Sequence, residues 1–179
     1  MHVLFFDPTH QIHNTINSKC WQTKGKHGTI NIQSNTGRRR ISILGAINPC
    51  DCKCTTLITE SNCDKEMIKA TLEIIRNDYP DNKEIVLILD NAKYNHAYET
   101  IDKANELNIR LLFLPTYSPN LNLIERLWKF FKKKLLGNKY YEHFEEFLFA
   151  TYNFFENIEI YKEDIESLLS QKFEILKAV

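Results

Sequence analysis

The chain has 179 residues, of which 43% are hydrophobic, and its 23 Lys and Arg balance 23 Asp and Glu. This length suits one domain, and this apolar content is enough to build a buried core, which argues against intrinsic disorder. The sequence contains neither a signal-peptide pattern nor an apolar run of about eighteen residues, so we expect a cytosolic protein without a membrane span.

The charges are unevenly distributed along the chain. Six basic residues and one acid lie between Glu125 and Lys139, whereas nine acids face three lysines from Tyr141 onward. A local concentration of positive charge within a neutral chain is compatible with a polyanion-binding surface, which an evenly mixed surface would not provide.

The N-terminal part predicts three antiparallel strands. The apolar run Val3–Phe6 predicts a buried strand that stops at Pro8. Two further strands are expected over residues 41–47 and 55–59, joined by a turn at residues 48–51 (Asn-Pro-Cys-Asp).

The middle of the chain alternates between helix and strand patterns. Apolar spacing predicts a helix over residues 64–77 and another from about 96 to 107. Short apolar runs predict strands at 85–89 and 110–114. Such alternation implies parallel crossover connections. Three antiparallel strands followed by strand, helix and strand is the order of the ribonuclease H-like α/β fold with a mixed sheet.

The C-terminal part is predicted to be helical. An apolar stripe beyond Pro119 predicts a helix that packs on the sheet and stops near Gly137. Two more helices, at about residues 142–157 and 162–176, complete the chain. We therefore divide the chain into a catalytic domain (1–137) and a C-terminal helical extension packed on it (138–179).

Five cysteines in a chain without export signals predict reduced thiols. Cys50, Cys52 and Cys54 alternate and would share one face of a strand. Structural zinc sites usually space cysteines two to four apart and need a second ligand pair, which the neighbouring sequence does not supply. We favour small strand residues here over a zinc site.

Three acids mark the boundaries of predicted elements. Asp7 and Asp90 each follow a buried strand, and Glu125 lies in the first turn of a helix. In open α/β sheets, ligands collect beyond the carboxyl ends of the strands. Three such carboxylates can hold two Mg²⁺ ions, which activate the attacking oxygen and stabilise the leaving oxygen of an in-line phosphoryl displacement.

Each acid also has an ordinary structural interpretation. Asp-Pro and Asp-Asn pairs commonly form turns after strands. Asn122 and Glu125 match a capping box, in which the acid only satisfies a backbone donor. These interpretations do not explain why the three acids fall at corresponding ends of neighbouring elements.

Three segments resemble the conserved blocks of the mariner superfamily of DDE transposases, especially its bacterial insertion-sequence branch. They are residues 4–14 (LFFDPTHQIHN), 87–97 (LILDNAKYNHA) and 114–134 (LPTYSPNLNLIERLWKFFKKK), and 34 residues separate Asp90 from Glu125, as in that branch. In the third block the matching residues, in order, are Pro115, Ser118, Pro119, Leu121, Asn122, Ile124, Glu125 and Trp128.

The resemblance covers residues 1 to about 150 and implies both a reaction and a site. Asp7, Asp90 and Glu125 would bind two Mg²⁺ ions, with Mn²⁺ able to substitute. The implied reaction is hydrolysis at the transposon ends, followed by attack of the freed 3′-hydroxyl on a TA target. Family practice also implies a homodimer on paired DNA ends.

The chain departs from the family pattern at two points. Position 123 is leucine where the family often has proline. Family members also carry helix-turn-helix modules ahead of the first catalytic strand, whereas Asp7 lies six residues from Met1. We therefore expect a catalytic domain without N-terminal DNA-binding modules.

Two groups of residues are candidate DNA contacts. Lys129 and Lys132 lie on the helix face of Glu125, and Arg126 and Lys133 flank them, so we favour contact with the DNA backbone over plain solvation. The second group follows Asp90, and phosphate contact and a simple polar loop are equally good interpretations of it. Its members are Asn91, Lys93 and His96.

The sequence argues against one rival function and leaves two others open. A haloacid dehalogenase-type phosphatase would need a second aspartate two residues after Asp7, where this chain has Thr9. A ribonuclease H-like nuclease without strand transfer would share the metal site. A transposase remnant that only binds DNA or transposase subunits would keep the fold without the activity.

Overall fold

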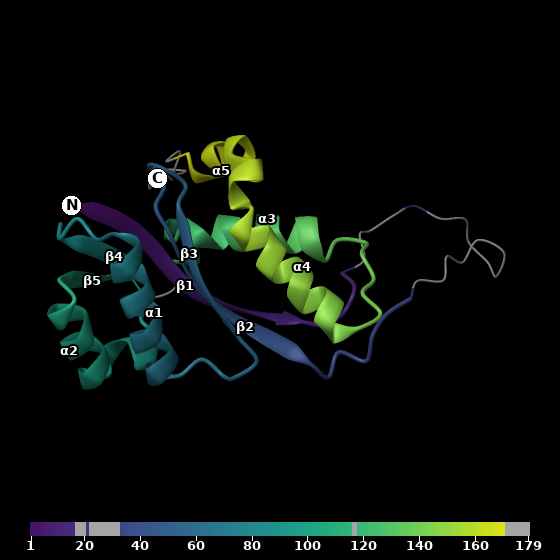
Figure 1. Cartoon of the computed structure of the whole chain (residues 1–179), viewed down its shortest axis with the longest axis horizontal. Coiled ribbons are helices and arrows are strands. Elements are labelled where there is room, and N and C mark those ends of the chain that lie inside the picture. Colours follow the sequence, from purple (N-terminus) through teal and green to yellow (C-terminus); the bar gives the residue numbers. More distant parts are fainter. Residues whose placement is uncertain (17–20, 22–32, 116–117, 171–179) are drawn as a thin grey trace, which may run out of the picture.

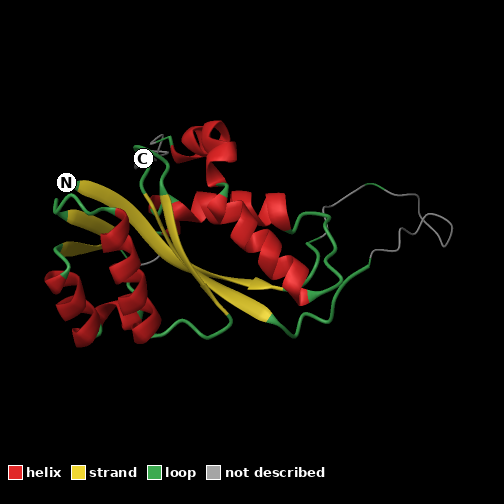
Figure 2. Cartoon of the chain, in the orientation of Figure 1, coloured by secondary structure: helices red, strands yellow, loops and turns green. Residues whose placement is uncertain are grey.

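A computed structural model describes residues 1–16, 21, 33–115 and 118–170 (Figures 1 and 2). Its centre is a five-stranded sheet of order β3-β2-β1-β4-β5, in which β1, β2 and β3 are antiparallel and β1, β4 and β5 are parallel. The strands are β1 (His2–Ile12), β2 (Arg40–Ile47), β3 (Cys54–Thr59), β4 (Ile85–Leu89) and β5 (Ile109–Phe113). The mixed sheet expected of a ribonuclease H-like fold is confirmed.

Helices cover both faces of this sheet (Figure 1). On one face lie α1 (Lys65–Asp78) and α2 (Tyr98–Glu106). On the other lie α3 (Ile124–Leu135), α4 (Phe144–Glu156) and α5 (Lys162–Leu169). The helix expected from residue 96 begins only at Tyr98, after a 3₁₀ turn at Lys93–His96.

The alternation of β1 decides on which face each residue lies. Leu4 and Phe6 belong to the core cluster beneath α1 and α2, whereas Phe5 belongs to the cluster beneath α3, α4 and α5. Because successive strand side chains point to opposite faces, Asp7 shares the face of Phe5. The first candidate carboxylate therefore lies on the side of the sheet that α3 covers.

The prediction that the first strand stops at Pro8 was wrong, because β1 continues to Ile12. The His13 N–H donates to the Arg39 carbonyl at 2.9 Å, so the odd-numbered residues of β1 bond to β2. The nitrogen of Pro8 thus points the other way, towards β4. Proline has no N–H to donate, but the ladder with β4 has already ended at the pair Phe5 and Ile88. Pro8 therefore costs no hydrogen bond to β4 and leaves the ladder with β2 intact.

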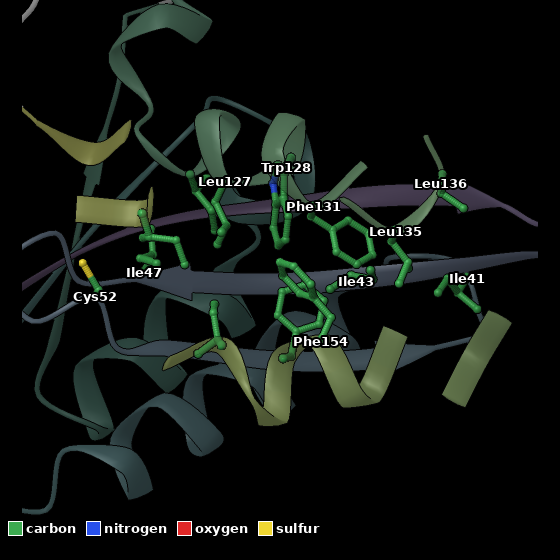
Figure 3. Close-up of a cluster of buried hydrophobic side chains, with 14 of the residues drawn as sticks. Ile41, Ile43, Ile47, Cys52, Leu127, Trp128, Phe131, Leu135, Leu136 and Phe154 are labelled. Atoms are coloured by element: carbon green, nitrogen blue, oxygen red, sulfur yellow. The ribbon is translucent and has the colours of Figure 1, made fainter. Parts of the chain in front are cut away.

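Helix α3 packs its apolar stripe against β1 and β2, and its largest buried side chain is Trp128 (Figure 3). The buried residues of the stripe are Ile124, Leu127, Trp128, Phe131 and Leu135. This is the stripe predicted from the sequence. The helix ends with Leu136 as its C-cap, just before Gly137.

The two C-terminal helices complete the core that α3 begins. Phe154 of α4 packs edge-on against Phe131 of α3 and Ile165 of α5 lies in the same buried cluster. The last helix predicted, 162–176, is described only as far as Ser170, and its remaining positions lie outside the described residues. The proposed boundary at residue 137 stays a prediction.

The cysteines do not share one strand face as expected. Cys50 lies in the turn before β3, Cys52 follows it with a positive φ of 60°, and only Cys54 is in the strand. The turn itself confirms the prediction for residues 48–51, since the Asn48 carbonyl and side chain accept from the Cys52 and Cys50 N–H groups. Among the described residues, Cys50, Cys52, Cys54 and Cys63 are free thiols.

None of the helices in the described part of the chain has the length and apolar character that a membrane span requires.

Candidate active site

Two of the candidate carboxylates lie near the carboxyl end of β4. Asp90 directly follows Leu89, the last residue of β4, and Asp7 lies in the neighbouring strand β1, two residues beyond Phe5, where the ladder with β4 ends. Asp7 does not follow its strand as expected but lies inside β1, because β1 continues to Ile12. Since β1 and β4 run parallel, Asp7 lies level with the carboxyl end of β4, where Asp90 emerges. The first and fourth strands are neighbours in the sheet, as a site shared by these two acids requires.

Glu125 approaches the carboxyl end of β4 from the face of the sheet that α3 covers. It lies in the first turn of α3, which contacts β1 and β2. Its negative charge acts on Asp7, as that of Asp90 does. The structure therefore brings the three acids predicted from the sequence into one electrostatic neighbourhood, with Asp7 at its centre.

The environment of Asp7 strongly disfavours its charged form. Burial, then the charge of Glu125, then the charge of Asp90 raise the pKa of Asp7 to about 8. The indole of Trp128 and the ammonium of Lys132 act in the opposite direction. Near neutral pH the metal-free protein therefore holds a large share of Asp7 in the protonated state.

Within the described ranges, no three His, Cys, Asp or Glu side chains are already arranged as the ligands of a metal ion. The chemistry of the donor set nevertheless fits hard divalent cations, because carboxylate oxygens are the ligands that Mg²⁺ and Mn²⁺ prefer.

Asp90 is held by a residue that the sequence did not single out. The side-chain amide of Asn95 donates to Oδ1 of Asp90 at 2.9 Å and to its backbone carbonyl at 3.3 Å, and the Ala92 N–H donates to the same Oδ1 at 3.1 Å. Asn95 is completely buried. Burial of an asparagine within a polar loop leaves no signal in the sequence, which is why this residue was missed.

The residues after Asp90 form a small structured loop. Asn91 donates to the carbonyl of Leu114, and His96 Nε2 lies 3.1 Å from Asn91 Oδ1. The His96 ring stacks on Phe113 with centroids 4.0 Å apart. These contacts tie the loop to the end of β5, while Lys93 is exposed. Contact of Asn91, Lys93 or His96 with DNA stays a prediction.

The capping-box interpretation of Asn122 and Glu125 was wrong. Leu123 is the N-cap of α3 and no side chain caps the helix there. Asn122 is buried and its side-chain amide instead donates to the Phe6 carbonyl at 2.9 Å. Asn122 therefore fastens the start of α3 to β1, next to Asp7.

Replacing Asn122 by alanine should destabilise the protein by about 1–3 kcal/mol, because the Phe6 carbonyl would remain buried without its donor. Chemical denaturation of the metal-free protein measures this. The matched control is the exposed Asn120, where alanine should change stability by less than about 0.5 kcal/mol. Equal stability of both variants would show that the hydrogen bond contributes nothing.

The basic residues of α3 differ in their exposure and contacts. Lys132 is partly buried and its charge acts on Asp7, whereas Lys129 and Lys133 are exposed. Arg126 donates to the carbonyls of Leu168 and Ser170, both at 2.9 Å, and so helps to hold the end of α5. For Arg126 the structure thus shows an intramolecular role beside the predicted contact with DNA.

Comparisons with known proteins agree with this architecture. A family model described as DDE superfamily endonuclease matches residues 2–148. The uncharacterized protein y4pE/y4sA of Sinorhizobium fredii is 33% identical over 104 residues, which make up 58% of this chain and 74% of that protein.

Among solved structures, the fold matches that of the Mos1 mariner transposase. The paired-end complex with Mg superposes with a TM-score of 0.70 at 16% identity, over 94% of this chain and 52% of that one. The strand transfer complex gives 0.67 at 13% identity, over 98% and 56%. The isolated catalytic domain gives 0.62 at 13% identity, over 94% and 77%.

This chain thus spans about half of the longer Mos1 chains and most of the catalytic domain. At such low sequence identities the structural similarity establishes only the fold. The family model matches most of the chain and therefore establishes the family. The chain belongs to the DDE superfamily of endonucleases.

Proposed function

We propose that this chain is the catalytic domain of a transposase that cuts DNA and joins the freed end to a target in a divalent-metal-dependent reaction. The observation that carries the proposal is the placement of three acids from separate parts of the chain. Burial of Asp7, then the charges of Glu125 and Asp90 beside it, raise the pKa of Asp7 to about 8. Strongly perturbed carboxylates of this kind are typical of functional sites.

Asp7, Asp90 and Glu125 would hold two Mg²⁺ ions, for which Mn²⁺ can substitute. When bound, the metals supply activation of the attacking oxygen and stabilisation of the leaving oxygen. Asn95 keeps Asp90 oriented at the end of β4, and Asn122 keeps the start of α3 against β1. Structures of Mos1 transposase with Mg and with Mn support the choice of cations.

The proposed partners are transposon-end DNA and a TA target, bound by a homodimer. Mos1 structures described as a paired-end complex with the left transposon end and as a strand transfer complex support a DNA partner. The exposed lysines of α3, on the same helix as Glu125, offer positive charge to the phosphate backbone.

The test is an assay of cleavage and joining with the purified chain. With Mg²⁺ or Mn²⁺ we expect nicking of supercoiled DNA, and transfer of an oligonucleotide 3′-hydroxyl into TA-containing DNA, and both should disappear in Asp90→Asn. Nicking without transfer would instead identify a ribonuclease H-like nuclease. DNA binding with no metal-dependent cleavage would indicate a protein that only binds.

The lysines of α3 permit a separate prediction for DNA affinity. Replacing Lys129 and Lys133 by alanine should flatten the dependence of log affinity on log salt by about one unit for each phosphate that the protein no longer neutralises. The matched control is Lys134→Ala, because Lys134 lies 3.5 Å from Asp164 and over the rings of Phe130 and Tyr161. Fluorescence anisotropy at several salt concentrations measures the slope, and equal slopes for all three proteins would mean that this face is only solvated.

A further inference from the structure

Trp128 buries a polar group, its indole N–H, within the hydrophobic core. The side chain is 1% exposed, and its indole N–H is buried without a hydrogen-bond acceptor among the described residues. An indole nitrogen can only donate, and buried donors are nearly always paired. The indole favours the charged form of the nearby Asp7 carboxyl, whose pKa it lowers.

Gly45 explains how the indole reaches that carboxylate. Gly45 lies directly across from Asp7 in the register of β1 and β2, and the two positions face the same side of the sheet. A β-carbon at position 45 would lie 2.5 Å from Cη2 and 2.9 Å from Cζ2 of Trp128. The ring therefore occupies the space where a side chain would stand, and Cζ2 is bonded to the ring carbon that carries Nε1.

The position of Trp128 on α3 links this contact to the third acid. Trp128 follows Glu125 by three residues, so both project from nearly the same side of the helix. Figure 3 shows the ring extending from α3 towards the sheet. One helix thus presents both the Glu125 carboxylate and the indole to Asp7.

We propose that Trp128 is a positioning residue for the DDE site: its indole N–H orients the Asp7 carboxylate, and Gly45 is the seat that admits the ring. A hydrogen bond from the indole to one carboxylate oxygen fixes the rotamer of Asp7 and leaves the other oxygen for a cation. A donor to a charged acceptor gives a stronger bond than one between neutral groups. The role in metal binding rests on the function proposed above.

The contact itself is tested without any metal, by the indole ¹⁵N–¹H resonances of the two tryptophans. Trp128→Phe identifies the Trp128 signal, since Trp21 is the other tryptophan of the chain. The spectra are recorded above about pH 8, where Asp7 is charged in the parent. We expect the Trp128 signal to move upfield in Asp7→Asn, where the acceptor loses its charge, and to move much less in Asp90→Asn. An unchanged Trp128 signal in Asp7→Asn would overturn the proposal.

The role in metal binding is tested by titrating Mn²⁺ and measuring free ion by electron paramagnetic resonance. Trp128→Phe keeps an aromatic ring but removes the N–H, and Gly45→Ala keeps the N–H but displaces the ring. Both should weaken Mn²⁺ binding about 10-fold or more, as removal of groups that orient metal ligands does. Phe155→Leu is the matched control, because Phe155 packs against Trp128 in the same core, with ring centroids 6.2 Å apart, and should leave Mn²⁺ affinity near that of the parent.

The outcomes separate this inference from the function on which it rests. A folded Trp128→Phe that binds Mn²⁺ as the parent does, while Asp7→Asn does not, would overturn the positioning role and leave the proposed function standing. A parent that binds no Mn²⁺ would refute the proposed metal site, and the resonance experiment would still decide whether the indole contacts Asp7. That experiment also serves where Trp128→Phe fails to fold, because Asp7→Asn leaves Trp128 in place, and the signal is then assigned through Trp21→Phe.

Discussion

Replacing Glu125 by glutamine is expected to abolish metal-dependent DNA cleavage while leaving the metal-free protein folded. Glutamine keeps the length of the side chain but lacks the negative charge that a hard divalent cation needs from its ligand. Removal of a charge that repels Asp7 should leave the metal-free Tm unchanged or raise it by a few degrees, since about 1 kcal/mol corresponds to about 2–4 °C in a chain of this size. The stabilisation that Mg²⁺ or Mn²⁺ gives the parent should largely disappear, as thermal unfolding with and without metal would show.

Glu66→Gln is the matched control for this substitution. Glu66 lies in the first turn of α1, as Glu125 does in α3, so both variants lose one acid at the positive end of a helix. Helix α1 covers the opposite face of the sheet, and its variant should cleave and respond to metal like the parent. Cleavage and a normal metal response in Glu125→Gln would place the third ligand elsewhere in the chain.

Asp7→Asn should make the metal-free protein more stable at neutral pH and inactive. A group whose folded pKa is raised contributes its stabilisation at low pH and loses it as the pH rises. With a folded pKa of about 8 and an ordinary value of 3.8, the metal-free parent should lose stability between about pH 4 and pH 8. The difference corresponds to up to about 6 kcal/mol.

Denaturation of parent and variant at a series of pH values measures this effect. Asp7→Asn should remove most of the decline, because the amide does not ionise. Asp164→Asn takes one negative charge from the exposed surface and so controls for net charge. Saturating Mg²⁺ should also reduce the decline in the parent. Parallel pH profiles for parent and Asp7→Asn would show that Asp7 is not held in a crowded acidic site.

Much of the fold followed from local pattern. The five apolar residues 85–89 became β4 with the predicted bounds, because a strand buried on both faces reads as a continuous apolar run. Helix α3 followed from its apolar stripe. Pro8 misled the prediction because proline forbids a hydrogen bond on one side of a strand only. Whether that side of β1 still has a neighbouring strand at Pro8 depends on where β4 ends, some eighty residues along the chain.

The candidate site likewise combines residues that the sequence predicts with residues that it does not. The positions of Asp90 and Glu125 could be predicted, because each marks the end or the start of an element with a clear period. The supporting groups could not be predicted, because their roles depend on distant partners. Asn122 resembled a helix cap in sequence and instead bonds to Phe6, and nothing near Gly45 in sequence indicates that a tryptophan ring lies on it.

The three carboxylates differ in what anchors them. Asp7 is paired with β2 inside the sheet and Asp90 directly follows β4, whereas Glu125 lies on a helix that side chains hold to the sheet. Proteins open locally in units of unequal stability, and we expect a helix held only by side-chain packing to open before strands that are paired on both sides. In native-state hydrogen exchange, the amides of α3 should therefore exchange sooner than those of β1 and β4. A cation shared between helix and strands would oppose that opening, so metal should slow exchange most in α3, and the same helix would set how readily the site releases its ions.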